Sequence, residues 1–173
     1  LNSIINFSKF VLKGTMGPIN DRQEEALTKV VSSSRHLLQL INDVLDMSKI
    51  ESGSLTLFVE PDINVNELLK TVVEMADSLL TDKPVALQLE IDDPLPLITG
   101  DRKRLLQIML NVVSNACKFT QEGHIKITAQ QQDDNLRLMV EDTGPGIAPA
   151  DYNLVFEAFK QTTSGLRQGG GTG

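Results

Sequence analysis

The sequence predicts an α+β protein in which a helical hairpin precedes an α/β sandwich. Residues 1–53 show only helical spacing of their apolar side chains, whereas residues 54–141 alternate between strand-like and helix-like patterns. The composition, 40% hydrophobic and 23% charged, is typical of a globular protein. A length of 173 residues suffices for one domain and a smaller element. We therefore expect two domains, at residues 1–53 and 54–173.

The first part reads as two helices, over about residues 1–13 and 21–50, separated by a Gly- and Pro-containing break. The long helix carries a heptad seam, and a second apolar stripe runs beside it along the same helix. The seam is Leu27, Val31, Ser34, Leu38, Ile41, Leu45 and Ser48, and the second stripe is Ala26, Val30, Leu37 and Val44. A two-helix hairpin cannot bury both stripes, so the pattern predicts a homodimer with a four-helix bundle. An intramolecular hairpin packed on its own domain is the alternative.

The second part alternates between strands and helices. Its predicted elements are a strand at 55–60, a helix capped by Asn64 and ending near Leu80, a strand at 85–91, a loop at 92–100, a helix at 101–119, strands at 124–131 and 136–141, and a short helix near 150–156. Strands and helices in this order predict an α/β sandwich.

The helix at 101–119 combines an apolar stripe with an unusual polar face. The predicted core stripe is Leu105, Ile108, Met109, Val112, Ala116 and Phe119. The opposite face presents Asn111, Asn115 and Lys118, at steps of four and three residues. Asparagine oxygen suits a hard cation such as Mg²⁺, and lysine suits phosphate. A polar surface with two chance asparagines is the alternative. Cys117 faces away from the polar face and is expected in the core.

Two glycine-rich segments follow. Asp142 ends a predicted strand and precedes Gly144 and Gly146, so a flat ligand could approach the backbone closely while the carboxylate accepts a hydrogen bond from it. An ordinary turn is the alternative. The run at 169–173 could cradle phosphates, although it lacks the features of a Walker or Rossmann loop and could equally be a linker.

The charge and the cysteine content narrow the function. A net charge of −7 and a pI near 4.8 disfavour nucleic-acid binding. The single cysteine excludes an internal disulfide, and no apolar run approaches the roughly 20 residues of a membrane span. Both ends read as cut, so we expect a fragment of a longer protein.

The order of the motifs resembles that of the histidine kinases over essentially the whole chain. Residues 111–120 (NVVSNACKFT) resemble the asparagine box and residues 142–147 (DTGPGI) the first glycine box. Residues 156–159 (FEAF) look like the phenylalanine box, and residues 170–173 (GGTG) like the start of the second glycine box. Residues 45–53 resemble the end of the dimerisation hairpin, and residues 1–5 resemble the segment after the phosphoacceptor box.

This resemblance implies a Bergerat-type sandwich that binds ATP and Mg²⁺. Asn115 would ligate the metal, Asn111 and Lys118 would contact phosphates or metal-bound waters, and Asp142 would accept from the adenine amino group. The glycines of both boxes would shape the adenine and phosphate pockets, beneath a lid at about 148–168. The implied nucleotide-binding set is Asn111, Asn115, Lys118, Phe119, Asp142, Gly144, Gly146, Ile147, Gly171, Thr172 and Gly173.

The resemblance also implies a function. The chain would be the cytoplasmic core of a two-component sensor kinase. The parent protein could be membrane-anchored or not. The chain itself would contact neither nucleic acid nor a membrane. It would dimerise, phosphorylate a histidine that precedes Leu1, and pass the phosphoryl group to a response-regulator aspartate. His36 lacks the acidic neighbour of a phosphoacceptor and is expected to be partly packed, and His124 to be structural. The fragment itself should therefore not autophosphorylate.

Two alternatives remain open at this stage. One is a non-catalytic, dimerising signal-relay module. The other is an ATPase of the same superfamily. Such enzymes carry a glutamate base near the position of Asn111, and the Asn111 amide cannot take a proton, so ATP hydrolysis is disfavoured.

Overall fold

The computed structural model describes residues 1–92 and 94–152, which fall into two compact units. The described part of the first unit comprises residues 1–56, and that of the second comprises residues 57–92 and 94–152. Within these described ranges, no helix is both long enough and apolar enough to cross a membrane.

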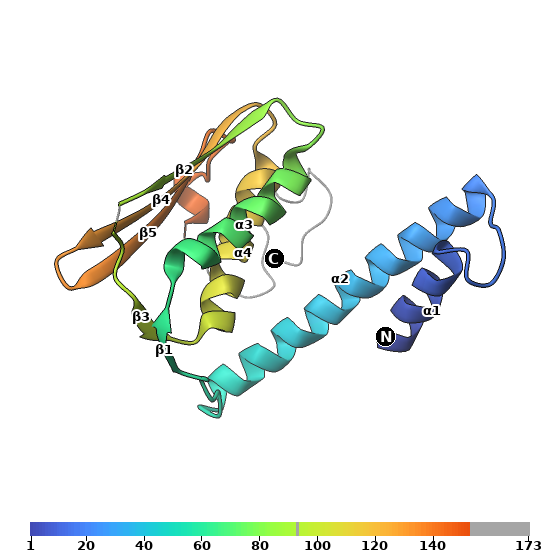
Figure 1. Cartoon of the computed structure of the whole chain (residues 1–173), viewed down its shortest axis with the longest axis horizontal. Coiled ribbons are helices and arrows are strands. Elements are labelled where there is room, and N and C mark those ends of the chain that lie inside the picture. The colour runs from blue at the N-terminus through green and yellow to red at the C-terminus, as the bar shows by residue number, and fades with distance from the viewer. Residues whose placement is uncertain (93, 153–173) are drawn as a thin grey trace. The chain divides into compact units, whose positions relative to one another are not determined.

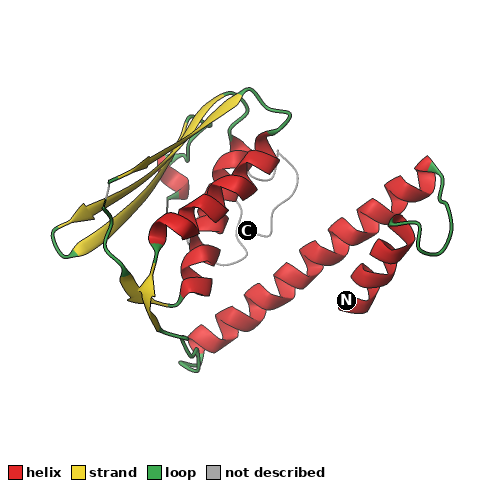
Figure 2. Cartoon of the chain, in the orientation of Figure 1, coloured by secondary structure: helices red, strands yellow, loops and turns green. Residues whose placement is uncertain are grey.

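The first unit is a helical hairpin (Figures 1 and 2), formed by α1 (Asn2–Leu12) and α2 (Asp21–Glu51). A reciprocal pair of hydrogen bonds starts α2. The Asn20 side chain accepts from the Gln23 backbone N–H, and the Gln23 side chain accepts from the Asn20 N–H, both at 3.0 Å. This capping box satisfies two of the backbone donors that a helix start leaves unpaired. Both predicted helices are confirmed.

The two helices pack along only part of the heptad seam. Ile5 and Ser8 of α1 are buried, as are Val31 and Ser34 of α2. At about 1.5 Å per residue, α1 covers about a third of the length of α2, and Figure 1 shows it along the N-terminal half. The distal seam residues Ile41 and Leu45 lie exposed. The whole second stripe is exposed as well: Ala26, Val30, Leu37 and Val44. His36 is also exposed, which corrects the expectation that it is partly packed.

The second unit is a two-layer sandwich. Its elements are β1 (Glu60–Ile63), α3 (Val65–Leu80), β2 (Val85–Ile91), β3 (Ile98–Gly100), α4 (Arg102–Phe119), β4 (Gly123–Gln132), β5 (Asn135–Asp142) and the 3-10 helix η1 (Pro149–Asp151). The main sheet has the order β2-β4-β5, with β2 parallel and β5 antiparallel to β4. Strands β1 and β3 form a separate antiparallel pair.

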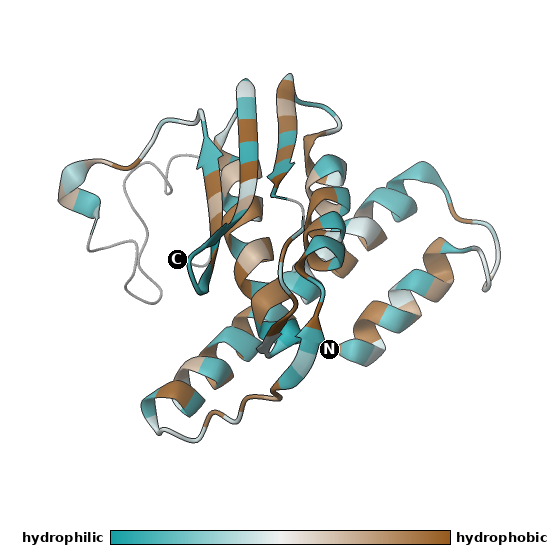
Figure 3. Cartoon of the chain, turned by 60° about the vertical axis from the view of Figure 1, so that its left-hand side comes forward, coloured by the Kyte–Doolittle hydropathy of each residue, from teal (hydrophilic) through white to brown (hydrophobic). Residues whose placement is uncertain are grey.

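Helices α3 and α4 cover one face of the sheet (Figure 1), and the core lies between these layers. The colouring of Figure 3 alternates along the strands, as expected of a sheet with one buried face. The buried core consists of Val65, Leu68, Leu69, Val72, Ala76 and Leu80 of α3, Met109, Val113, Ala116 and Cys117 of α4, and Ile125, Ile127 and Ala129 of β4. The predicted helix starting after Asn64, the strand at 85–91 and the final hairpin are confirmed.

The first predicted strand, at residues 55–60, is wrong. Strand β1 begins only at Glu60, because its partner β3 lies opposite Glu60 and Ile63, and the predicted loop at 92–100 therefore contains a strand. The Phe58 N–H donates instead to a side chain, that of Asp101. The predicted short helix near 150–156 starts as η1 at Pro149, and its part beyond residue 152 lies outside the described residues.

The predicted core stripe of the helix at 101–119 is partly wrong. Met109 and Ala116 are buried as expected, and Cys117 lies in the core as predicted, but Val113, which the stripe did not include, completes the buried face. These four positions are spaced four, three and one residues apart, which places them on one side of the helix. Ile108 and Val112 are instead 59% and 46% exposed. Each directly precedes a buried residue, and successive residues of a helix point about 100° apart around its axis.

Candidate functional site

Helix α4 is held at its N-terminus by Asp101. The Asp101 Oδ1 accepts from the backbone N–H of Arg104 at 3.0 Å, which caps the helix. Its Oδ2 accepts from the Phe58 backbone N–H at 3.0 Å. The Arg104 N–H, and then the Phe58 N–H, hold the pKa of this carboxyl below its usual range, because both bonds favour the ionised form. The start of α4 is thus tied to the segment that enters the sandwich.

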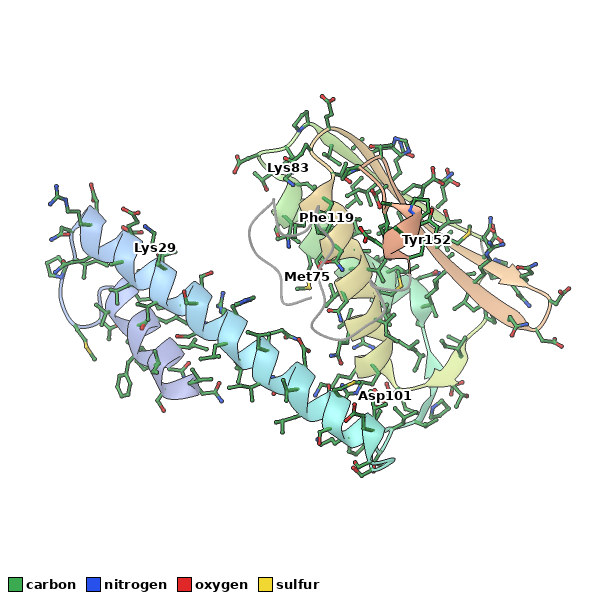
Figure 4. The ribbon with its side chains drawn as sticks, turned by 180° about the vertical axis from the view of Figure 1, so that it is seen from behind. Lys29, Met75, Lys83, Asp101, Phe119 and Tyr152 are labelled. Atoms are coloured by element: carbon green, nitrogen blue, oxygen red, sulfur yellow. The ribbon has the colours of Figure 1, made fainter. Side chains whose placement is uncertain are left out.

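A lysine from outside the helix holds its C-terminus. Lys83 lies between α3 and β2, and its Nζ donates to the carbonyl oxygens of Cys117 at 2.6 Å, Thr120 at 3.1 Å and Lys118 at 3.2 Å. Figure 4 shows Lys83 and Phe119 at the same end of α4. The last carbonyls of a helix have no partner within it, and a cation there also opposes the negative end of the helix dipole.

The predicted polar face of α4 lies on the surface. Asn111 and Asn115 are exposed, and Ile108 and Val112 lie exposed beside them. Lys118 is half-buried, and its ammonium lies 4.9 Å from the centroid of the Phe119 ring, a cation–π contact. The helix therefore offers neutral amide oxygens along its side and a positive charge near its end.

The loop after β5 meets this end of α4. Asp142 is exposed at the end of the strand, and its Oδ1 accepts from the Gly144 N–H at 2.8 Å. A Cβ at Gly144 would lie 2.7 Å from that oxygen and 3.4 Å from the backbone carbonyl of Phe119. A side chain at Gly144 would therefore displace the Asp142 carboxylate oxygen, whereas its contact with the end of α4 would be an ordinary one. The structure brings together Phe119, Asp142 and Gly144, which lie in separate motifs of the sequence.

Thr143 fastens the loop to β4, a role that sequence reasoning missed. Its Oγ1 accepts from the His124 N–H at 3.0 Å and lies 3.1 Å from the Glu122 carbonyl oxygen, to which the hydroxyl donates. Its backbone N–H donates to the His124 carbonyl at 3.2 Å. His124 participates through its backbone, in keeping with the expected structural role. A hydroxyl residue between Asp142 and Gly144 was visible in the sequence, but its partners lie about 20 positions earlier, at the start of β4 and just before it.

The remaining candidates are only partly described. Gly146 adopts φ +68°, a conformation that favours glycine, and Ile147 is exposed beside it. Gly171, Thr172 and Gly173, the phenylalanine box at 156–159 and most of the predicted lid lie outside the described residues.

The described residues fit a magnesium nucleotide chemically. One Asp142 oxygen is engaged by the loop, and within the described ranges the other has no hydrogen-bond partner, so it can accept from an amino group. The amides of Asn111 and Asn115 supply oxygens of the kind that Mg²⁺ takes, and the Lys118 ammonium supplies charge for phosphate.

Comparisons with known proteins identify the family of both parts of the chain. Residues 1–53 match the model of the "His Kinase A (phospho-acceptor) domain", and residues 100–173 match that of the "Histidine kinase-, DNA gyrase B-, and HSP90-like ATPase". The sensor protein GacS of Pseudomonas syringae pv. syringae is 40% identical over 185 residues, which cover 100% of this chain and 19% of GacS. The chain spans about a fifth of the length of the curated relatives that it matches.

Solved structures show the same fold. Full-length ShkA in complex with AMPPNP matches with a TM-score of 0.76 and 34% identity, over 96% of this chain and 36% of that one. Histidine kinase ThkA in complex with response regulator protein TrrA matches with a TM-score of 0.64 over 94% of this chain and 49% of that one. Its identity of 23% shows the fold alone. The chain belongs to the sensor histidine kinases, and it comprises a dimerisation-type helical unit followed by an ATP-binding unit of the Bergerat fold.

Proposed function

We propose that the sandwich unit binds Mg-ATP between the outward face of α4 and the loop after β5. Asp142 accepts from the adenine amino group, Gly144 and Gly146 let the base approach the backbone, and Phe119 packs near it. Ile147 closes the adenine end, and Gly171, Thr172 and Gly173 meet the phosphates. The observation that carries this proposal is the position of Gly144, where a side chain would displace the Asp142 carboxylate and contact the end of α4.

Magnesium is proposed at Asn115, with Asn111 and Lys118 contacting phosphates or the waters on the metal. Within residues 1–92 and 94–152, no cluster of three or more His, Cys, Asp or Glu side chains could hold a metal ion. A cation at Asn115 would therefore take its other oxygens from phosphate and water, as is usual for Mg²⁺. A metal held at Asn115 would supply positive charge against the phosphates.

The reaction proposed for the parent protein is phosphorylation of a histidine, followed by transfer to an aspartate of a response regulator. ThkA is a histidine kinase that forms a complex with a response regulator, and a receiver domain is the partner proposed here. The helical unit is proposed to dimerise, because its second stripe is exposed in the single chain. The chain is proposed to lie in the cytoplasm. The phosphoacceptor histidine is proposed to lie outside residues 1–173.

Calorimetric titration with ATP, in the presence and absence of Mg²⁺, tests the site. Asn115→Ala should abolish the magnesium-dependent part of ATP binding, because the amide oxygen ligates the metal. The matched control is Asn135→Ala, since Asn135 begins β5, at the opposite end of the strand from Asp142. Unchanged, magnesium-dependent affinity in Asn115→Ala would disprove the assignment of the metal ligand.

A further inference from the structure

Lys83 is a half-buried lysine that belongs to none of the nucleotide-binding motifs. It lies in the turn between α3 and β2, where the Lys83 N–H donates to the Leu80 carbonyl at 2.9 Å and the Lys83 carbonyl accepts from Val85 at 2.8 Å. These bonds hold the lysine backbone against the sandwich. The side chain reaches residues 34 to 37 positions further along the chain.

The geometry at its ammonium is that of a satisfied cation. An ammonium has three N–H donors, and Lys83 Nζ has three carbonyl oxygens within 3.2 Å, those of Cys117, Lys118 and Thr120. Lys126 provides a contrast in the same unit. Its Nζ pairs at 2.8 Å with Glu90, whose side chain is largely exposed, and such a surface pair contributes little to stability.

The three carbonyls surround the part of α4 that belongs to the proposed site. The Lys118 and Thr120 carbonyls are the two peptide oxygens on either side of that of Phe119, and a Cβ at Gly144 would lie 3.4 Å from the Phe119 oxygen. One backbone bond, from the Thr120 N–H to the Ala116 carbonyl at 3.0 Å, also closes this turn. Without the ammonium, the carbonyls of Cys117 and Lys118 would lose a charged partner, and the last turn would be free to fray.

We propose that Lys83 is a positioning residue for the nucleotide: it fixes the last turn of α4, and through it the Lys118 ammonium, the Phe119 ring and the backbone beneath Gly144. This inference rests on the proposed ATP site. Lys83, in the turn between α3 and β2, would thus hold in place the groups that contact both the phosphates and the adenine.

Three variants test the inference by calorimetric titration with Mg-ATP, at a temperature where circular dichroism shows each protein fully folded. Lys83→Met keeps the aliphatic stem and removes the donors, and it should bind Mg-ATP roughly tenfold more weakly. Lys83→Arg keeps charge and donors and should recover most of the affinity. Lys126→Met removes a charge elsewhere in the unit and should bind normally. Should Lys83→Met fail to fold, Lys83→Gln replaces it, since it retains N–H donors without the charge.

A purely structural role gives a different result. It predicts that Lys83→Met melts at a lower temperature while the folded protein binds Mg-ATP as tightly as wild type, and that outcome overturns the inference. Weak binding by both Lys83→Met and Lys126→Met would also overturn it, because it would point to overall charge.

A double-mutant cycle with Lys118→Ala separates this inference from the proposed function. If Lys118→Ala alone leaves Mg-ATP affinity unchanged, the proposed phosphate contact fails, whatever Lys83 does. If Lys118→Ala weakens binding, Lys83→Met in that background should cost less than it does in wild type, because part of its effect acts through Lys118. Fully additive losses would contradict positioning through Lys118.

Discussion

Oδ2 of Asp101 accepts a hydrogen bond of 3.0 Å from the backbone N–H of Phe58, 43 positions earlier in the chain. The Phe58 side chain itself is 81% exposed, and Leu57 and Val59 are exposed on either side of it. This segment is therefore held by a backbone bond to a carboxylate rather than by burial of its apolar side chains. The same carboxylate caps α4 through Arg104, so one ionised group joins the entry of the sandwich to the helix of the site.

The first prediction is that Asp101→Asn destabilises the sandwich at neutral pH and that the deficit fades in acid. Asparagine still caps a helix, but its amide nitrogen cannot accept from Phe58. The folded-state pKa of Asp101 lies below the usual value, so its contribution is complete above about pH 4 and is lost as the pH falls through the folded-state value.

Urea unfolding at pH 7 and at successively lower pH values measures this effect. The matched control is Asp134→Asn, at an exposed carboxyl in the β4–β5 turn, which should show no such pH-dependent deficit. A deficit for Asp101→Asn that stays constant, or grows, below pH 4 would contradict the role of the ionised carboxylate.

The second prediction concerns recognition of the base. Asp142→Ala should weaken binding of ADP and ATP far more than binding of GDP and GTP, because only the adenine base presents an exocyclic amino group at the corresponding ring position. Competition of each nucleotide with a fluorescent ATP analogue measures the ratio. An equal loss for adenine and guanine nucleotides would place Asp142 outside the base contact.

The third prediction is that Gly144→Ala reduces ATP affinity with little loss of stability. The added methyl would lie 2.7 Å from Asp142 Oδ1, and a flexible side-chain oxygen can move away, which would break the bond to the Gly144 N–H. Gly100→Ala is the control, since its Cβ would meet Leu105 at an ordinary 3.4 Å. Thermal melting and calorimetry should show Gly144→Ala folded but weak in binding, and wild-type affinity would refute a role of this loop geometry in ATP binding.

The fourth prediction concerns assembly. Replacing both Leu37 and Val44 with Glu should convert dimers to monomers, because these side chains are 47% and 50% exposed in the single chain and charges in a dry interface are costly. Ser33→Glu, at an exposed position of α2, serves as the control. Sedimentation velocity at micromolar concentration distinguishes the species. A monomeric wild type, or a double variant that remains dimeric, would exclude a bundle through the second stripe.

The fifth prediction is that residues 1–173 do not become phosphorylated when incubated with γ-labelled ATP. His36 is exposed on α2 without an acidic neighbour, and phosphoryl transfer requires the acceptor in line with the γ-phosphate. Gel autoradiography after base treatment, which preserves phosphohistidine, gives the measurement. Label that disappears in His36→Ala would identify His36 as the acceptor after all.

Local patterns in the sequence determined most of the elements and the family. The apolar periodicity over residues 21–50, the Asn64 cap and the alternation at 85–91 each depend on neighbours within a few positions, so they could be predicted with no knowledge of the fold. The motifs around Asn115 and Asp142 indicated the histidine kinases for the same reason. The assignment of nucleotide contacts to individual residues of these motifs stays a prediction.

Only the tertiary structure decided which side of α4 is buried and what holds its ends. The spacing of apolar residues predicted Ile108 and Val112 in the core, but both are exposed and Val113 is buried instead. Strand β1 starts at Glu60 because its partner lies in residues 98–100, a pairing that no local pattern encodes. Lys83 and Asp101 act on backbone groups 34 to 43 positions away. Every backbone carries the same donors and acceptors, so their pairing depends on how the chain folds rather than on the residue types nearby.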